Sequence, residues 1–173
     1  MQELQKLQNR IQELEAQLVH YKSQWEKDSL TGCLRRDAFH ERLKQLDNTQ
    51  SWSVIIIDID HFKRINDSFG HDTGDHVIAS LGRTLQKHLP PGGLCARWGG
   101  EEFVMLVPLS LASARFLAES LRRWVQQKAS PTRFTISAGV ELLRSSQEFT
   151  ESLAQADKKL YQAKASGRNQ VAA

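Results

Sequence analysis

A run of β-branched residues in the first half of the chain limits the fold most. Residues 53–59 read Ser-Val-Ile-Ile-Ile-Asp-Ile, which is typical of a buried strand at the centre of a sheet. Asp58 and Asp60 lie at its end, and because strand side chains alternate, both carboxylates point to the same face. A buried acid is costly unless it is paired, protonated or bound to a metal ion. This strand end is therefore a candidate functional site.

A second candidate lies between two apolar runs, residues 94–98 and 103–107. The two glycines at 99–100 predict a hairpin, because tight hairpin turns need the positive φ angles that glycine adopts at little cost. Glu101 and Glu102 follow at once. One interpretation is a plain hairpin with solvated acids. The other is a place where a phosphate and a metal ion approach the backbone closely.

Helical spacing accounts for most of the remaining domain. A short helix should follow the strand, with Asp60 as its N-cap, and residues 69–75 should form a turn-rich loop. A further strand is expected at 134–143. The apolar spacing predicts longer helices over 37–46, 76–89, 111–128 and 149–166. These elements predict an antiparallel-containing sheet covered by helices, an α+β architecture.

The first 25 residues carry a heptad repeat. Its apolar positions are Leu4, Leu7, Ile11, Leu14, Leu18, Tyr21 and Trp25. This pattern predicts a parallel two-stranded coiled coil over residues 1–27, followed by a domain over 28–173. A single helix that folds back on the domain is the alternative. Since the repeat is already running at residue 4, we expect an upstream segment with a sensory domain.

Residues 28–32 break the helical pattern and join the coiled coil to the domain. Asp28 and Thr31 are expected to cap this opening turn locally. The alternative is that the turn transmits a change in helix register.

Composition excludes several classes of protein. Hydrophobic residues make up 40% and charged residues 25%, as in an ordinary globular chain, and a net charge of +3 argues against nucleic acid or an anionic membrane as partner. No apolar run has membrane-spanning length, and the N-terminus lacks a signal-peptide core. Cys33 and Cys95 lie far apart and form no metal-spaced motif, which fits a reducing compartment without disulfides. We expect a cytoplasmic protein.

Several separate motifs resemble, in order and spacing, the GGDEF domain of diguanylate cyclases. They are residues 28–32, 58–67, 70–75, 99–103 and 156–169, and the match covers about residues 28–171. The resemblance implies a palm-like fold related to nucleotide cyclases and polymerases. It also implies conversion of two GTP into cyclic di-GMP and two pyrophosphates, with two Mg²⁺ or Mn²⁺ ions per active site.

The resemblance also implies roles for individual residues. Asp58, Glu101, Glu102 and the Ile59 carbonyl would bind metal, in keeping with the preference of hard cations for oxygen. Lys63 and Glu101 would be catalytic. Because a metal-bound carboxylate is a poor base, two roles are possible for Glu101: it accepts the proton of the attacking hydroxyl, or it serves only as a metal ligand. The substrate-binding residues would be Phe62, Lys63, Asn66, His71, Asp75, Gly99, Gly100, Lys164 and Arg168. For the last two, complementing a helix dipole is the alternative.

Asn66 and Asp75 match the family's guanine-reading pair. Guanine presents N1–H and N2–H together, and a carboxylate accepts both hydrogen bonds. Adenine lacks this pair of donors, so the site should reject ATP.

Two further expectations concern regulation and assembly. Many relatives carry an inhibitory Arg-x-x-Asp site five residues before the Gly-Gly motif, where this chain has Pro-Pro-Gly-Gly at 90–93, so no inhibitory site is expected. One domain binds one GTP and the product needs two, so a homodimer with facing sites, held by the coiled coil, is expected. The alternatives are a nucleotide receptor without turnover, a purely structural dimerisation module, and a cyclase for another nucleotide.

Overall fold

The computed structural model describes residues 2–46, 50–128 and 132–173, and is built around a five-stranded sheet in the order β2-β3-β1-β4-β5. β1 pairs antiparallel with β3 and β4, β2 pairs antiparallel with β3, and β5 runs parallel to β4. The bounds of β1 to β5 are Trp52–Ile59, Leu94–Arg97, Glu102–Val107, Ile136–Leu143 and Val171–Ala172. The mixed sheet and its helices confirm the α+β class. The short strand β5 was not predicted.

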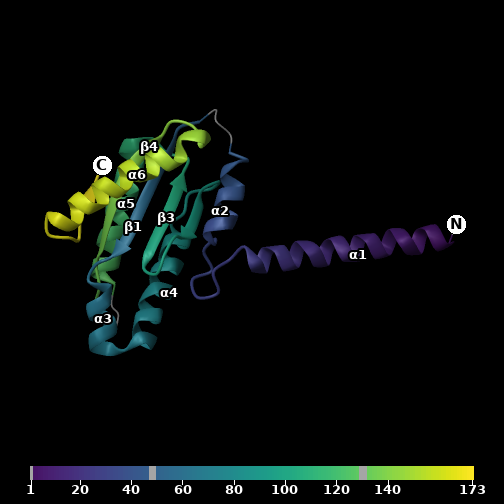
Figure 1. Ribbon diagram of the computed structural model, residues 1–173, viewed down its shortest axis with the longest axis horizontal. Coiled ribbons are helices and arrows are strands. Elements are labelled where there is room, and N and C mark those ends of the chain that lie inside the picture. Colours follow the sequence, from purple (N-terminus) through teal and green to yellow (C-terminus); the bar gives the residue numbers. More distant parts are fainter. Residues whose placement is uncertain (1, 47–49, 129–131) are drawn as a thin grey trace.

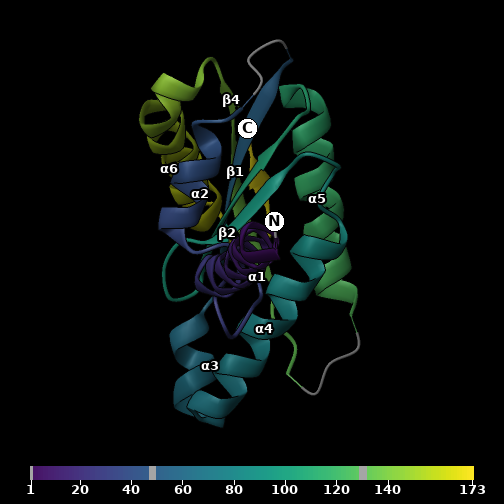
Figure 2. The same cartoon turned by 90° about the vertical axis from the view of Figure 1, so that its right-hand side faces the viewer.

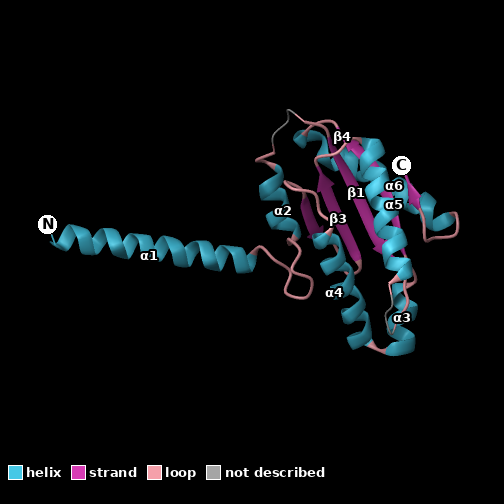
Figure 3. Cartoon of the chain, turned by 180° about the vertical axis from the view of Figure 1, so that it is seen from behind, coloured by secondary structure: helices cyan, strands magenta, loops and turns pink. Residues whose placement is uncertain are grey.

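The helices cover both faces of this sheet. Figure 2 shows α4 and α5 on one side and α2 and α6 on the other. Seen from behind, α4 and α5 lie in front of the strands (Figure 3). The bounds of α1 to α6 are Gln2–Trp25, Arg36–Leu43, Phe62–Phe69, His71–Lys87, Leu111–Gln127 and Phe149–Ala165, with a 3-10 turn at Ser146–Glu148.

β1 is buried along its whole length, as its sequence predicted. Ile55, Ile57 and Ile59 pack in the core under α4 and α5, whereas Val54 and Ile56 belong to the core under α2 and α6. Both faces of the strand are therefore covered by apolar side chains. The face that carries Val54 and Ile56 continues to Asp58, which points toward α6.

Close contact between α6 and β4 positions the C-terminal end of α6 beside the end of β1. Gly139 makes the contact possible, because a Cβ there would collide with the backbone of Ala156 and Leu160. Gly167 has a φ of +114° just beyond the helix, the conformation expected of a residue that ends it. The chain after α6 then turns back toward the sheet and forms β5.

Two predictions around α3 are wrong. Asp60 is not the N-cap, because α3 begins at Phe62 and the residue before it is His61, with a φ of +56°. Residues 69–75 are not a loop either, since α4 already begins at His71. The physical reason is Gly70, whose φ of +84° reverses the chain in a single residue and lets the next helix start at once.

α1 projects away from the domain (Figure 1). All of its heptad side chains are exposed, from 46% for Leu14 to 74% for Trp25. The alternative of a helix that folds back on the domain is therefore wrong. Within the described residues, no helix combines the length and apolar character needed to cross a membrane.

Candidate active site

Three carboxylates lie together at one end of the sheet. β1 and β3 pair so that Asp58 lies directly opposite Glu102, and Glu101 precedes Glu102 in the hairpin loop. Asp58 is buried, whereas the two glutamates are half-buried. The pairing of the strands thus joins the two candidate segments of the sequence, the strand end and the Gly-Gly hairpin.

Lys164 forms an ion pair with one of these acids. Its Nζ atom lies 2.8 Å from Oδ2 of Asp58, and the lysine comes from the last turn of α6. Burial raises the pKa of Asp58 to about 6, and the charges of Glu101 and Glu102 act in the same direction, while Lys164 opposes them. Asp58 is therefore a carboxyl whose charged form is only partly compensated by the protein.

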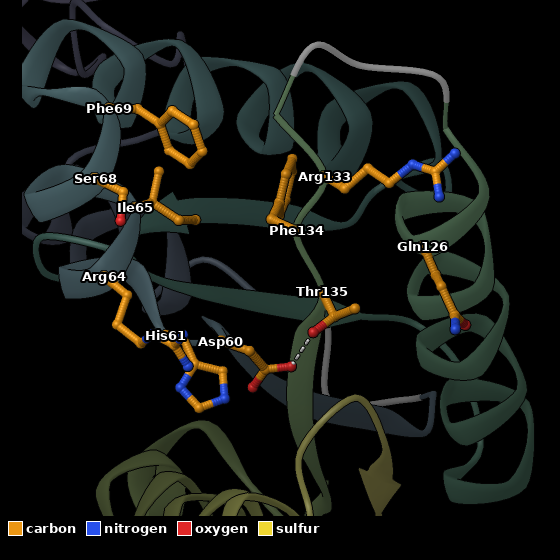
Figure 4. A pocket seen from close by; sticks show the side chains of 10 residues that line it. All are labelled: Asp60, His61, Arg64, Ile65, Ser68, Phe69, Gln126, Arg133, Phe134 and Thr135. Atoms are coloured by element: carbon orange, nitrogen blue, oxygen red, sulfur yellow. Dashed lines mark hydrogen bonds between the residues drawn. The ribbon is translucent and has the colours of Figure 1, made fainter.

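Asp60 has the opposite surroundings. Its carboxylate accepts hydrogen bonds from Oγ1 of Thr135, Oγ of Ser137 and the backbone N–H of Asn169, at 2.7, 2.7 and 2.9 Å. Figure 4 shows the bond to Thr135. These donors come from the start of β4 and from the segment after α6. Asp60 therefore joins three parts of the fold, a structural role that differs from the predicted N-cap.

The loop between β2 and β3 closes differently from the prediction. Neither Gly99 nor Gly100 has a positive φ. A Cβ on Gly99 would lie 3.0 Å from Oε2 of Glu102, whereas a Cβ on Gly100 would meet no atom within 4 Å. A side chain at residue 99 would therefore require the Glu102 carboxylate to shift by a few tenths of an ångström.

Arg97 holds this loop, a role that the sequence did not reveal. Its guanidinium donates to the Gly100 carbonyl at 2.8 and 3.1 Å and pairs with the Asp28 carboxylate at 3.2 Å. Asp28 also accepts from the backbone and hydroxyl of Thr31, which confirms the predicted local capping. Burial pushes the pKa of Asp28 up, but the bonds from Thr31 and Arg97 outweigh it and hold the pKa below its usual value. A lone arginine at the end of an apolar strand was the available signal.

The two predicted guanine-reading residues lie on neighbouring helices, Asn66 on α3 and Asp75 on α4. Oδ1 of Asn66 is buried without a hydrogen-bond partner among the described residues. It lies against Gly74 of α4, where a Cβ would collide with it. Asp75, the next residue in the sequence, is exposed and lines a cavity of about 450 Å³ together with Leu30 and Arg83. An unsatisfied buried acceptor and an exposed carboxylate are both groups that can accept hydrogen bonds from a ligand.

The remaining predicted substrate residues surround the acids less closely. Phe62 and Lys63 form the first turn of α3, where the backbone N–H groups have no intrahelical acceptors. Lys63, His71 and Arg168 are exposed. Of the three predicted phosphate-binding cations, Lys63, Lys164 and Arg168, Lys164 is the one that forms a salt bridge within the described ranges.

The donor atoms at the strand end suit a hard divalent cation. Asp58, Glu101 and Glu102 supply carboxylate oxygens, and Ile59, which is buried, supplies a backbone carbonyl. Nevertheless, no three Asp, Glu, His or Cys side chains in the described part of the chain gather tightly enough to hold an ion by themselves. The donor chemistry of these residues fits such a cation.

A separate cavity of about 490 Å³ lies between α3 and the segment before β4, with Arg64 and Phe134 in its lining. Figure 4 shows that Arg133 points away from Arg64 toward Gln126, so the two arginines do not converge on one position. We assign no ligand to it.

The fold also brings together two residues that the sequence kept apart. The thiols of Cys33 and Cys95 are buried, with Sγ atoms 3.7 Å apart and no disulfide between them.

Comparison with known proteins gives this arrangement a context. The family model described as "Diguanylate cyclase, GGDEF domain" matches residues 26–170. The diguanylate cyclase DgcM of Escherichia coli (strain K12) is 40% identical over 168 residues, covering 92% of this chain and 40% of DgcM. The chain therefore spans less than half the length of that relative.

Two solved structures are similar in fold. The coiled coil and GGDEF domain of DgcB from Caulobacter crescentus, in complex with c-di-GMP, has a TM-score of 0.85 at 26% identity and covers 98% of this chain and 96% of that one. The active GGEEF domain of a diguanylate cyclase from Vibrio cholerae has a TM-score of 0.70 at 34% identity, covering 81% and 96%. The chain belongs to the GGDEF-domain family of diguanylate cyclases.

Proposed function

We propose that this chain is a diguanylate cyclase that condenses two GTP molecules into cyclic di-GMP and two pyrophosphates. The observation that carries the proposal is the meeting of Asp58, Glu101 and Glu102 at one sheet end, in a chain of this family. DgcM, DgcB and the Vibrio cholerae domain are similar over most of the chain, which supports the same activity here.

Each group has a role in this reaction. The 3′-hydroxyl of one GTP attacks the α-phosphorus of the other, and Mg²⁺ or Mn²⁺, when bound, would stabilise charge on the attacking and leaving oxygens. Asp58, Glu101, Glu102 and the Ile59 carbonyl would hold the cations.

The cationic groups and the glycines would receive the triphosphate. Lys63, Lys164 and Arg168 would offset the phosphate charge, and the N–H groups of Phe62 and Lys63 would donate to the terminal phosphates. The open backbone at Gly99 and Gly100 leaves room for the nucleotide. His71, at the start of α4, is a further substrate contact by family resemblance.

The direct test is incubation with GTP and Mg²⁺, with the product identified by mass. We expect cyclic di-GMP from the wild-type chain and none from Glu101→Gln. Binding of GTP without any product would favour the receptor alternative. A different cyclic product would identify a cyclase of another class.

Guanine specificity is assigned to Asn66 and Asp75. The Asn66 oxygen, which lacks a hydrogen-bond partner among the described residues, and the exposed Asp75 carboxylate on the next helix support this assignment. Asp75→Ala should raise KM for GTP more than it lowers kcat, because the lost bonds are made to the bound base as well as in the transition state. A sharp fall in kcat with unchanged KM would contradict the guanine-reading role.

Dimerisation through α1 is the second part of the proposal, with residues 1–27 as the coiled coil and 28–173 as the catalytic domain. The exposed heptad stripe supports it, since a polar helix with one bare apolar face gains most by pairing. Replacing Leu14 and Leu18 with glutamine should make specific activity fall steeply on dilution. Unchanged specific activity at nanomolar protein would count against it.

Two regulatory expectations follow. The turn at 90–93 offers neither Arg nor Asp, so cyclic di-GMP should not inhibit through it. An upstream sensory segment would act through α1 and the Asp28–Arg97 contact. Consumption of GTP is consistent with a cytoplasmic location.

A further inference from the structure

Lys164 bonds the acid that is expected to bind a cation, and this pairing has a consequence for the order of binding. Its Nζ lies 2.8 Å from Oδ2 of Asp58. The side chain of Asp58 is 8% exposed and that of Lys164 is 31% exposed. The acid is therefore enclosed, while the lysine can reach solvent without unfolding anything.

Binding an ammonium group and a divalent cation to this carboxylate at the same time is unfavourable. Lys164 occupies Oδ2, and a divalent cation on the same carboxylate would lie within a few ångströms of the ammonium group, where the two positive charges repel strongly because water is scarce. No salt bridge links Glu101 or Glu102 to a cationic side chain in residues 2–46, 50–128 and 132–173. Within those ranges, Lys164 is thus the cationic side chain that forms a salt bridge with one of the three acids Asp58, Glu101 and Glu102.

Hydrogen bonds fix the backbone around Lys164, whereas its side chain can rotate. The N–H of Arg168 bonds the Ala163 carbonyl at 3.0 Å, and the N–H of Asn169 bonds Asp60 at 2.9 Å, which fixes the end of α6. A lysine is a compact charge on a flexible stem and can change partners by rotating its side chain. A triphosphate beside the acids would offer it a new anionic partner.

We propose that Lys164 competes with the divalent cation for Asp58, and thereby couples cation binding to triphosphate binding. Without a phosphate partner the lysine stays on Asp58 and weakens cation binding. When the triphosphate arrives, the lysine moves to the phosphates and releases the carboxylate. The inference rests on the proposed function, because it assigns a further positioning role to a residue of the same site.

The test measures Mn²⁺ affinity in the absence of nucleotide, from the electron paramagnetic resonance signal of free Mn²⁺. Lys164→Gln should bind Mn²⁺ about tenfold more tightly than wild type, within the usual range of coupling between sites. Lys164→Arg keeps the charge and should bind as weakly as wild type. Lys158→Gln is the matched control, since it removes an exposed lysine from the same helix and should leave the affinity unchanged.

The other outcomes are equally specific. In the double variant Asp58→Asn, Lys164→Gln, the gain should disappear. If Lys164→Gln binds Mn²⁺ no more tightly than wild type, and only melts at a lower temperature, the lysine is merely structural and the inference is overturned. Absence of Mn²⁺ binding in both proteins overturns it as well.

A parallel GTP assay separates this inference from the proposed function. Cyclic di-GMP formation by wild type together with unchanged Mn²⁺ affinity in Lys164→Gln overturns the inference alone. A tenfold gain in the Mn²⁺ affinity of Lys164→Gln, together with no cyclic di-GMP formation by wild type, supports the inference and overturns the proposed function.

Discussion

The two aspartates at the end of β1, Asp58 and Asp60, have opposite surroundings. Both aspartates are buried, at 5% and 4% exposure. Asp60 receives three hydrogen bonds from β4 and from the chain after α6. Asp58 has one lysine partner and two acidic neighbours. The same residue type, two positions apart, thus serves to hold the fold in one case and stays reactive in the other.

This difference shows how the fold separates stability from chemistry. A carboxylate with fully satisfied hydrogen bonds stabilises the structure but has little capacity left for a ligand. A carboxylate whose charge is under-compensated costs stability and binds a cation readily. The structure places the first kind where β4 and α6 must be joined and the second where β1 meets the hairpin.

The largest expected effect separates the two acids by activity. Asp58→Asn should lower GTP turnover by at least about a hundredfold, because a metal ligand supplies several kcal/mol of transition-state stabilisation. Its melting temperature should not fall. Product formation and thermal unfolding of the same preparation check both halves. A variant that loses activity only because it unfolds would break the comparison.

Asp60→Ala should reverse this pattern. It leaves the buried Ser137 hydroxyl and two other donors without their acceptor, which should lower the free energy of unfolding by about 3 kcal/mol. Urea unfolding measures the change. Asp67→Ala, at an exposed position on α3, is the matched control and should change stability by less than about 0.5 kcal/mol.

The pH dependence of stability sharpens the comparison further. The pKa of Asp58 is raised from 3.8 to about 6, so between about pH 4 and pH 6 the folded chain binds more protons than the unfolded chain. The contribution of Asp58 to stability should therefore fall as pH rises through this window and stay low above it.

Asp58→Asn should remove this slope. With a metal chelator present, the variant should match wild type near pH 4 and exceed it above pH 6, by about 1–2 kcal/mol after allowance for solvent screening. Urea unfolding at a series of pH values gives the curve. Parallel curves for the two proteins would mean that the charge of Asp58 is well compensated after all.

The smallest effect comes from a single donor of the structural acid. Thr135→Val keeps the shape and removes one of the three bonds to Asp60, at a cost of about 1 kcal/mol. GTP turnover should remain within about twofold of wild type. A large loss of activity would show that the surroundings of the two aspartates are coupled.

Local patterns in the sequence predicted much of this protein. The run 53–59, the spacing of the longer helices and the heptad repeat each depend on neighbouring residues and were confirmed as elements. The errors were local as well. The positive φ values expected at Gly99 and Gly100 occur instead at residues such as Gly70, where the chain reverses within one residue.

The partners of the site residues could not be predicted in this way. Asp60 accepts hydrogen bonds from Thr135, Ser137 and Asn169, which follow it in the sequence by 75, 77 and 109 residues. Arg97 pairs with Asp28, from which it is separated by 69 residues. Cys33 and Cys95 meet over 62 positions. No periodicity reports such contacts, because they depend on how helices pack on the sheet.

By itself, the sequence determined which segments become helix or strand and which acids, amides and cations are available, since propensity, periodicity and donor chemistry are properties of the residues. Only the tertiary structure decided that the Asp60 carboxylate receives three hydrogen bonds while Asp58 pairs with Lys164. That outcome depends on α6 lying directly on β4 at Gly139, a contact that places the end of one helix beside the end of a distant strand.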